Sequence, residues 1–208
     1  MRQERPIRIA IQQKGRLREA SLGFFRAKGM DFDMSNPRAL IARSADGSVE
    51  AVFVRNGDIP KYVGFGAADF GIVGENVLYE QDVELPVVKQ MGFGQCSLVI
   101  AIPQNHSTPQ LSALAHERIA TKYPNSLRKF LQQRGINASI IELKGSVEIA
   151  PLLGLADAVC DITQTGSTLK EHGLAVIDKI LDSQAVIIES PGRSTQKKDF
   201  INRYFRTL

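Results

Sequence analysis

The chain has 208 residues, of which 43% are hydrophobic and 23% are charged, proportions that are ordinary for a globular protein. Its 26 basic and 22 acidic residues are scattered along the sequence and give a net charge of +4, which is too mild to indicate a nucleic-acid-binding protein. No apolar run approaches the roughly 18 residues that cross a bilayer, and the N-terminus has no secretory signal, so we expect a cytoplasmic protein.

Strand-like and helical patterns alternate from the N-terminus, which predicts an α/β fold with mostly parallel sheets. A strand is expected at 7–11, followed by a helix at 16–29 that has one apolar face and ends at Gly29. Two more strands are expected at 49–55 and 68–74.

The same alternation continues in the second half of the chain. Strand material is expected at 96–103, 118–123, 138–143, 157–162 and 175–190. Asn125 is expected to cap a helix that ends at Gly135, and a short helix is expected at 146–156. Ser194 is expected to cap a final amphipathic helix that runs through 205.

The final helix suggests that the chain returns to pack against its beginning. We therefore expect two lobes. The first lobe combines 1–94 with 184–208, and the second lobe, 95–183, is inserted between these segments.

Cysteine and histidine residues give little sign of catalysis. Cys96 and Cys160 lie inside apolar runs without the spacing of a zinc site, so we expect small buried thiols. His106, His116 and His172 are isolated, and no carboxylate partner is evident for any of them. We assign none of these histidines to catalysis.

A polar turn follows the strand expected at 157–162 and has the composition of a phosphate site. Backbone N–H groups at a helix N-terminus bind phosphate, glycine lets the backbone approach closely, and hydroxyl groups add donors. The turn supplies one glycine and four hydroxyl residues: Thr163, Thr165, Gly166, Ser167 and Thr168. Upstream of them, Asp161 is placed to accept hydrogen bonds from two vicinal hydroxyls of a sugar. The alternative is that the hydroxyl residues only cap the helix and that Asp161 only holds a turn.

Two basic clusters and one acid extend the set of candidate residues. Lys14 and Arg16 flank Gly15 between a strand and a helix, which suits a nucleotide or a pyrophosphate, although surface pairs of this kind are common. Arg55, just past a strand end, is placed to clamp phosphate oxygens or else to pair with Asp58 and order the loop. The acid is Glu148, which lies in the first turn of the helix expected at 146–156. It is a candidate site residue, and the alternative is that it only compensates the helix dipole.

These stretches together resemble the short form of the ATP phosphoribosyltransferase catalytic subunit. The resemblance runs in order through "KGRL", "VRNGDIP", "GAADFGIVGEN", "GFGQCSLVIAIP", "RIATKYP" and "GSVEIAPLLGLADAVCDITQTGSTL". It implies a two-lobed fold of the periplasmic-binding-protein type (type II), with a cleft between the lobes. The implied enzyme is a glycosyltransferase that joins N1 of ATP to C1 of 5-phosphoribosyl 1-pyrophosphate, with release of pyrophosphate, in the first step of histidine biosynthesis. The implied partner is a regulatory subunit resembling a histidyl-tRNA synthetase, in a hetero-octamer of four chains of each kind.

The resemblance also implies roles for individual residues. It puts the 5′-phosphate on the turn residues Thr163, Thr165, Gly166, Ser167 and Thr168 and the ribose hydroxyls on Asp161, with Glu148 also in the substrate site. It puts the nucleotide and the pyrophosphate on the two basic clusters, Lys14, Gly15, Arg16 and Arg55. We expect Asp161, Arg16 and Arg55 to act in catalysis. Mg²⁺ is expected to arrive with the pyrophosphate group rather than on a protein site.

Two departures from the family pattern and two rival functions remain. His172 stands where asparagine is usual and Glu75 where aspartate is usual, but both changes leave the phosphate turn intact. The rivals are a non-catalytic two-lobed module that binds a small molecule and a phosphoribosyltransferase for another base. A module that only binds has no need of both an anion turn and a second basic cluster.

Overall fold

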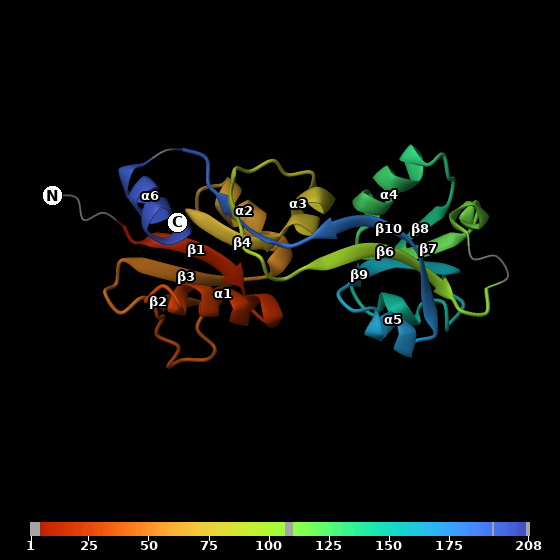
Figure 1. Ribbon diagram of the computed structural model, residues 1–208, viewed down its shortest axis with the longest axis horizontal. Coiled ribbons are helices and arrows are strands. Elements are labelled where there is room, and N and C mark those ends of the chain that lie inside the picture. The colour runs from red at the N-terminus through yellow and green to blue at the C-terminus, as the bar shows by residue number, and fades with distance from the viewer. Residues whose placement is uncertain (1–4, 107–109, 193, 207–208) are drawn as a thin grey trace. The chain divides into compact units, whose positions relative to one another are not determined.

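The structure is a computed structural model that describes residues 5–106, 110–192 and 194–206 (Figure 1). The chain forms two compact units. Unit 1 consists of Met1–Leu78, Asp82–Gly94 and Gln184–Leu208, and unit 2 consists of Tyr79–Gln81 and Gln95–Ser183. No helix of the described residues is long and apolar enough to span a membrane.

Unit 1 is built on a six-stranded sheet with the order β2-β3-β1-β4-β11-β5. Its strands are β1 (Ile7–Gln12), β2 (Ile41–Arg43), β3 (Val49–Val54), β4 (Phe70–Gly74), β5 (Val87–Gln90) and β11 (Ala185–Glu189). Its helices are α1 (Arg16–Arg26), the 3₁₀ turn η1 (Asn56–Asp58), α2 (Ile59–Gly64), α6 (Thr195–Phe200) and the π-helical turn η4 (Ile201–Phe205), and α3 (Glu75–Gln81) begins in this unit.

Strand alternation in unit 1 builds an apolar layer on each face of the sheet. Ile9, Ile11 and Phe53 pack with Phe25 of α1 and Phe205 of η4, whereas the intervening strand residues pack against α2 and α3. Figure 1 shows α1 and α2 on opposite sides of the sheet. Strand β1 is parallel to β3 and β4, so the carboxyl ends of these three strands lie at one edge.

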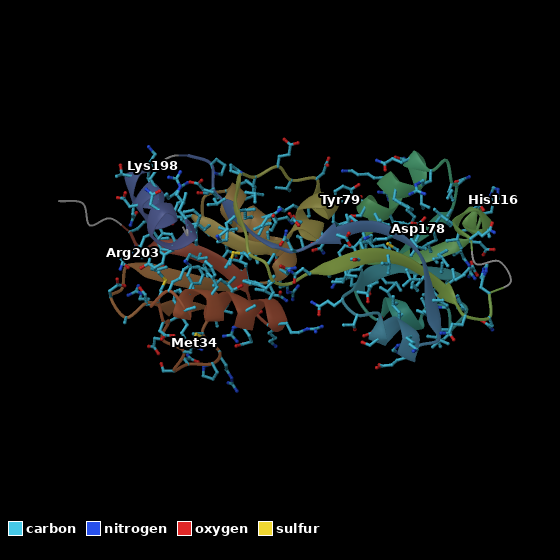
Figure 2. All side chains as sticks on the ribbon, in the orientation of Figure 1. Met34, Tyr79, His116, Asp178, Lys198 and Arg203 are labelled. Carbon is cyan, nitrogen blue, oxygen red and sulfur yellow. The ribbon has the colours of Figure 1, made fainter. Side chains whose placement is uncertain are left out.

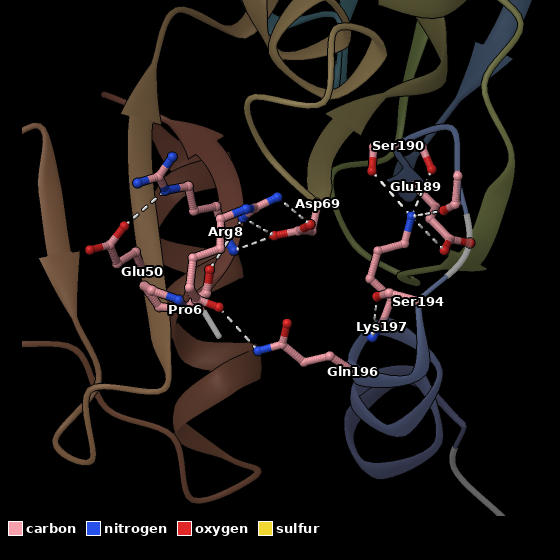
Figure 3. Close-up of polar contacts among 11 residues, drawn as sticks. Pro6, Arg8, Glu50, Asp69, Glu189, Ser190, Ser194, Gln196 and Lys197 are labelled. Atoms are coloured by element: carbon pink, nitrogen blue, oxygen red, sulfur yellow. Dashed lines mark hydrogen bonds and ion pairs between the residues drawn. The ribbon is translucent and has the colours of Figure 1, made fainter. Parts of the chain in front are cut away.

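The C-terminal helix is fixed to unit 1 by a buried lysine (Figure 3). Lys197 is 4% exposed, and its Nζ donates to the Ser190 carbonyl at 2.8 Å and lies 3.1 Å from Glu189 Oε1. The Ser194 hydroxyl accepts a hydrogen bond from the Lys197 backbone N–H at 3.1 Å, which confirms the expected N-cap. Burial of this ammonium is tolerated because carbonyl, hydroxyl and carboxylate oxygens surround it.

Unit 2 contains a five-stranded sheet with the order β10-β6-β9-β7-β8. Its strands are β6 (Cys96–Pro103), β7 (Arg118–Thr121), β8 (Ser139–Glu142), β9 (Ala158–Thr163) and β10 (Leu174–Ser183). Its helices are the 3₁₀ turns η2 (Leu111–Leu114) and η3 (Val147–Ile149) with α4 (Pro124–Gln133) and α5 (Ser167–Glu171). Helix α4 covers one face of this sheet, and α5 and η3 cover the other (Figure 1).

The α/β class is confirmed, but both sheets are mixed rather than mostly parallel. In unit 1, β11 runs antiparallel to β4 and β5, and in unit 2, β6 runs antiparallel to β9 and β10. Strands β6 and β11 directly follow the segments that join the two units, and β2 adds a further antiparallel pair with β3 at the edge of the first sheet. The parallel strands are therefore confined to β3-β1-β4 and β9-β7-β8.

Two local expectations were wrong. Asn125 lies inside α4 rather than at its cap, because Glu80 occupies the helix N-terminus and accepts hydrogen bonds from the backbone N–H groups of Asn125 (3.0 Å) and Ser126 (2.8 Å). The segment 146–156 forms only the short turn η3 followed by irregular turns. Gly154, at φ +67°, interrupts a regular helix there.

Candidate functional site

The polar turn of unit 2 connects β9 to α5 and presents its hydroxyl groups around a glycine N-cap. Gly166 is left-handed (φ +78°), and its N–H donates to Thr163 Oγ1 at 2.8 Å. Thr165 Oγ1 lies 3.0 Å from Ser167 Oγ. The N-cap residue Gly166 gives α5 no side-chain cap, but the Thr163 and Thr165 hydroxyls accept the Gly166 N–H and the Ser167 N–H (3.4 Å), so these two hydroxyls also have the structural role that the alternative expected. The exposed hydroxyls and the helix N–H groups form a surface suited to phosphate oxygens.

Asp161 stands on β9, two residues before the strand ends. Its carboxylate accepts a hydrogen bond from the Ile162 N–H at 2.8 Å. Burial raises the pKa of Asp161, and the negative charge of Glu148 raises it further, whereas that backbone hydrogen bond and the positive charge of Lys122 lower it. The charges of Glu148 and Lys122 therefore both act on Asp161. Lys122, which directly follows β7, a strand parallel to β9, was not among the expected site residues.

The basic residues of unit 1 gather at the carboxyl edge of β1 and β3. Gln12, the last residue of β1, pairs in register with Val54, the last residue of β3. The chain leaves the sheet at this edge in two places, through Lys14, Gly15 and Arg16 after β1 and through Arg55 after β3.

Gly15 has φ +101° and ψ 179°, a conformation that favours glycine, and precedes α1 without a side-chain cap. A Cβ atom on Gly15 would lie 3.3 Å from Gln12 Nε2, and its φ disfavours any side chain. Lys14 and Arg16 are exposed, and neither makes an ion pair within residues 5–106, 110–192 and 194–206.

Arg55 is exposed and starts the loop that leads into α2. The Asp58 N–H donates to the Arg55 carbonyl at 2.9 Å, so backbone contacts order this loop. The alternative of an Arg55–Asp58 ion pair is not seen among the described residues, and the Arg55 guanidinium is left available to an anion.

The remaining polar residues do not extend the site. The His172 ring Nδ1 lies 2.8 Å from the Thr168 carbonyl at the end of α5, and Glu75 accepts from the Gln184 N–H at 3.1 Å, so the two departures from the family pattern have local partners. His116 lies on the loop before β7 (Figure 2). The described residues contain no group of three or more acidic, histidine or cysteine side chains that would hold a metal ion.

The cysteines are reduced and structural. Cys160 is fully buried, and burial raises the pKa of its thiol to about 12. Cys96 is half-buried rather than buried, and partial burial also raises the pKa of its thiol. Thiolate chemistry at neutral pH is therefore unfavourable at both positions.

The structure thus brings the expected residues together in two sets, one in each unit. Unit 2 holds the residues expected to bind the sugar phosphate, which are Glu148, Asp161 and the turn at 163–168. Unit 1 holds the cationic set, which consists of Lys14, Gly15, Arg16 and Arg55.

Sequence comparisons identify relatives that span nearly the whole chain. The family model "HisG: ATP phosphoribosyltransferase" matches residues 55–208. An ATP phosphoribosyltransferase of Cytophaga hutchinsonii is 42% identical over 196 residues, which cover 94% of this chain and 68% of that protein. One from Phocaeicola vulgatus is 39% identical and covers 94% of this chain and 69% of that protein.

Structural comparisons agree with the sequence comparisons. An ATP phosphoribosyl transferase (HisG:HisZ) complex from Thermotoga maritima matches with a TM-score of 0.81 and 32% identity, covering 96% of this chain and 94% of that chain. The periplasmic aliphatic sulphonate binding protein SsuA from Escherichia coli matches with a TM-score of 0.62 and 15% identity, covering 96% of this chain and 70% of that chain. The second match concerns the fold alone and shows the expected periplasmic-binding-protein architecture.

Proposed function

The chain belongs to the ATP phosphoribosyltransferase family, and from this premise we propose that it joins N1 of ATP to C1 of 5-phosphoribosyl 1-pyrophosphate and releases pyrophosphate, in the first step of histidine biosynthesis. The enzyme is a glycosyltransferase. The observation that carries the proposal is the turn with a left-handed Gly166 and four hydroxyl residues, which follows a strand bearing the partly buried Asp161.

Unit 2 binds the sugar phosphate in this proposal. The hydroxyl groups and backbone N–H groups of the turn bind the 5′-phosphate, and the Asp161 carboxylate accepts hydrogen bonds from the ribose hydroxyls. Glu148 contributes from η3. Because hydrogen bonds to a charged group contribute about 1.5–3 kcal/mol each, this carboxylate fixes the ribose firmly.

Unit 1 supplies the cations for the nucleotide and for the leaving pyrophosphate. Lys14, Arg16 and Arg55 are exposed and have no ion-pair partner in the part of the chain that the structure describes. Charge-assisted hydrogen bonds from arginine to phosphate are strong, so these side chains suit phosphate groups. Mg²⁺ would enter with the pyrophosphate group of the substrate, where it would supply positive charge that stabilises the leaving group.

Catalysis in this proposal comes from positioning and from charge stabilisation. N1 of adenine is a weak neutral nucleophile, so alignment of the two substrates supplies a large part of the rate, on the order of 7–11 kcal/mol for well-oriented reactants. Arg16 and Arg55 stabilise the charge that develops on the leaving pyrophosphate. Asp161 accepts hydrogen bonds from the ribose hydroxyls and so fixes the position of C1 as it becomes oxocarbenium-like. No general base is proposed.

The similar chain from Thermotoga maritima belongs to a HisG:HisZ complex. By analogy, we propose that this chain is the catalytic subunit of a hetero-octamer with four HisZ-like regulatory subunits that resemble histidyl-tRNA synthetase. We also propose that 1–94 with 184–208 and 95–183 are its two functional domains. Since ATP and phosphoribosyl pyrophosphate are cytoplasmic metabolites, we propose that the enzyme acts in the cytoplasm.

The proposed function is tested by mixing the chain with ATP, phosphoribosyl pyrophosphate and Mg²⁺, with and without a HisZ-type subunit. We expect pyrophosphate release that depends on ATP. Release that instead requires another nucleobase indicates a phosphoribosyltransferase of a different kind. Ligand binding without any pyrophosphate release indicates a binding module and contradicts the proposal.

A further inference from the structure

Arg18, in the first turn of α1, packs against the core beside the cationic set of unit 1. Its guanidinium carbon lies 4.6 Å from the centre of the Phe53 ring, which is buried on β3. Arg18 is half-buried, and its Nε is shielded from solvent without a hydrogen-bond partner. A guanidinium over an aromatic ring is held there by a cation–π contact. Packing therefore fixes the position of this side chain, although no carboxylate of the described residues pairs with it.

Arg55 extends toward the same face of the sheet as Phe53 and Arg18. Phe53 belongs to the apolar cluster on the α1 side of the sheet. Val54 still accepts a hydrogen bond from the Gln13 N–H at 2.7 Å, and the Arg55 backbone is extended (φ −64°, ψ 141°), so the alternation of β3 continues to Arg55. Two residues of extended chain span at most about 7 Å. Arg55 is therefore the next residue on this face, just beyond the ring that carries Arg18.

The start of α1 is also unusually rich in positive charge. Lys14 and Arg16 stand at the beginning of the helix, and Arg18 follows in its first turn. A helix N-terminus carries partial positive charge, so cations there are unfavourable and an anion is favourable. Glu19 is the acid of the same turn, but it forms no ion pair with any residue in the described ranges. A bound anion would compensate the charges of this turn.

Other arginines of unit 1 are neutralised by acids of the protein. Arg8 Nε and Arg43 Nε lie 2.9 Å and 3.1 Å from the carboxylate of Glu50. Among the residues that the structure describes, only two buried side-chain polar atoms have no hydrogen-bond partner, and these are Arg18 Nε and Asn56 Oδ1. Asn56 directly follows Arg55 in sequence. Since buried polar groups are nearly always hydrogen-bonded, these exceptions mark the carboxyl edge of β3 as a place where a ligand would supply partners.

We propose that Arg18 is a further substrate-binding residue of the cationic set, and that its guanidinium donates hydrogen bonds to a phosphate group together with Arg55. This inference rests on the proposed function, in which unit 1 binds polyphosphate groups. A guanidinium presents its donors in a planar fork that matches phosphate oxygens. The Phe53 ring already holds this fork, so less conformational entropy is lost when the phosphate binds. Both ATP and the pyrophosphate group offer such a phosphate, and the test distinguishes them.

The test compares Arg18→Met with the unchanged chain, using equilibrium affinities for ATP, for pyrophosphate and for adenosine, which has no phosphate. Methionine keeps a flexible apolar chain over Phe53, so the packing is retained. We expect the affinity for ATP or for pyrophosphate to fall about tenfold, the size of a hydrogen bond to a charged group. The ligand that loses affinity is the one whose phosphate Arg18 binds. Adenosine affinity stays unchanged, and Arg18→Lys, which keeps the charge without the fork, retains part of the lost affinity.

The matched control is Arg26→Met, because Arg26 carries the same charge at the other end of α1, where it pairs with Asp31 at 2.9 Å. This variant should bind all three ligands normally. Unchanged affinity of Arg18→Met for both ATP and pyrophosphate overturns the inference and leaves Arg18 with its packing contact alone. An equal loss for adenosine also overturns it, because the variant has then disturbed unit 1 as a whole. Absence of ATP-dependent pyrophosphate release instead contradicts the proposed function, while the affinities for ATP and pyrophosphate still test Arg18.

Discussion

Arg118 and Asp157 form a bidentate ion pair at the start of β7 and β9. Arg118 Nη2 lies 2.8 Å from Asp157 Oδ1, and Arg118 Nε lies 3.0 Å from Oδ2. The Arg118 backbone N–H also donates to Oδ2 at 2.9 Å, and the third guanidinium nitrogen, Nη1, donates to the Gly154 carbonyl at 3.0 Å. Asp157 therefore joins the amino ends of two parallel strands.

Because of this ion pair, we expect the free energy of unfolding to depend on pH in a defined acidic range. The Arg118 guanidinium lowers the pKa of Asp157 from 3.8 to about 2. A carboxylate whose pKa is lower in the folded state stabilises the protein fully above the unfolded value, and this contribution disappears as the pH falls from about 4 to about 2. We expect Asp157→Asn to reduce the free energy of unfolding at pH 7 and to make no difference near pH 2, measured by urea denaturation across that range.

The matched control is Asp31→Asn, which breaks an exposed pair with Arg26 whose side chains are 68% (Arg26) and 69% (Asp31) exposed. That change should alter stability by less than about 1 kcal/mol at any pH. A constant difference between Asp157→Asn and the unchanged protein from pH 7 to pH 2 would contradict the assignment.

The second prediction concerns Asp161. Asp161→Ala removes the acceptor for the ribose hydroxyls, and we expect the affinity for phosphoribosyl pyrophosphate or kcat/KM to fall about tenfold or more, since hydrogen bonds to a charged group contribute about 1.5–3 kcal/mol. Isothermal titration and steady-state kinetics measure this loss. Asp157→Asn serves as the control because Asp157 directly precedes the start of the same strand, away from the turn. This variant should bind phosphoribosyl pyrophosphate with near-normal affinity. Near-normal binding in Asp161→Ala would remove Asp161 from the site.

The third prediction concerns Gly166. Its φ of +78° is unfavourable for a β-branched residue, while nothing lies within 4 Å of the position of an added Cβ atom. Gly166→Val should therefore distort the turn rather than clash, and should weaken phosphoribosyl pyrophosphate binding by about tenfold, given about 1–3 kcal/mol for a strained residue. Gly166→Asn should lose less, because asparagine tolerates this conformation better. Equal affinities for all three proteins would show that the turn does not bind phosphate.

The fourth prediction concerns the cations of unit 1. Arg16→Ala and Arg55→Ala should each weaken binding of ATP or of pyrophosphate by about tenfold, because an arginine–phosphate pair is a strong charge-assisted interaction. Equilibrium binding of ATP and of pyrophosphate is measured separately, and the ligand whose affinity falls is the one that the arginine binds. Arg26→Ala removes an equivalent charge from the other end of α1 and should bind both ligands normally. Unchanged affinity for both ligands in Arg16→Ala and Arg55→Ala would make these arginines structural.

Local sequence patterns predicted the parts of the fold that short-range physics controls. The strand expected at 7–11 is β1, and Ser194 caps α6, because apolar alternation and a side-chain cap involve only near neighbours in sequence. The prediction of Asn125 as the cap of α4 was wrong. Glu80 accepts the Ser126 N–H from 46 residues away, and such a partner is invisible to any local pattern.

In the candidate site too, some features follow from local sequence and others depend on tertiary structure. The turn around Gly166 was predictable because its composition carries its chemistry. The hydrogen bond from the Thr121 hydroxyl to the carbonyl of Cys160, the residue before Asp161, was not predictable from spacing, since it depends on the parallel register of β7 with β9, which brings together residues 39 positions apart. Sheet order was also out of reach, because the return of β11 between β4 and β5 is a tertiary choice.

The last prediction concerns the buried Lys197. Lys197→Met removes the donor to the carbonyl and hydroxyl of Ser190 and the ion pair with Glu189, so we expect it to lower the free energy of unfolding by about 2–3 kcal/mol. Chemical denaturation measures this loss. Lys198→Met is the matched control, because Lys198 is the exposed neighbour on the same helix (Figure 2) and its loss should change stability by no more than about 0.5 kcal/mol. If both variants unfold at the same denaturant concentration, the ammonium does not hold α6 in place, and the contacts of the Phe200 ring with Phe70 (5.5 Å) and the Gln196 hydrogen bond to the Arg5 carbonyl (3.2 Å) hold it instead.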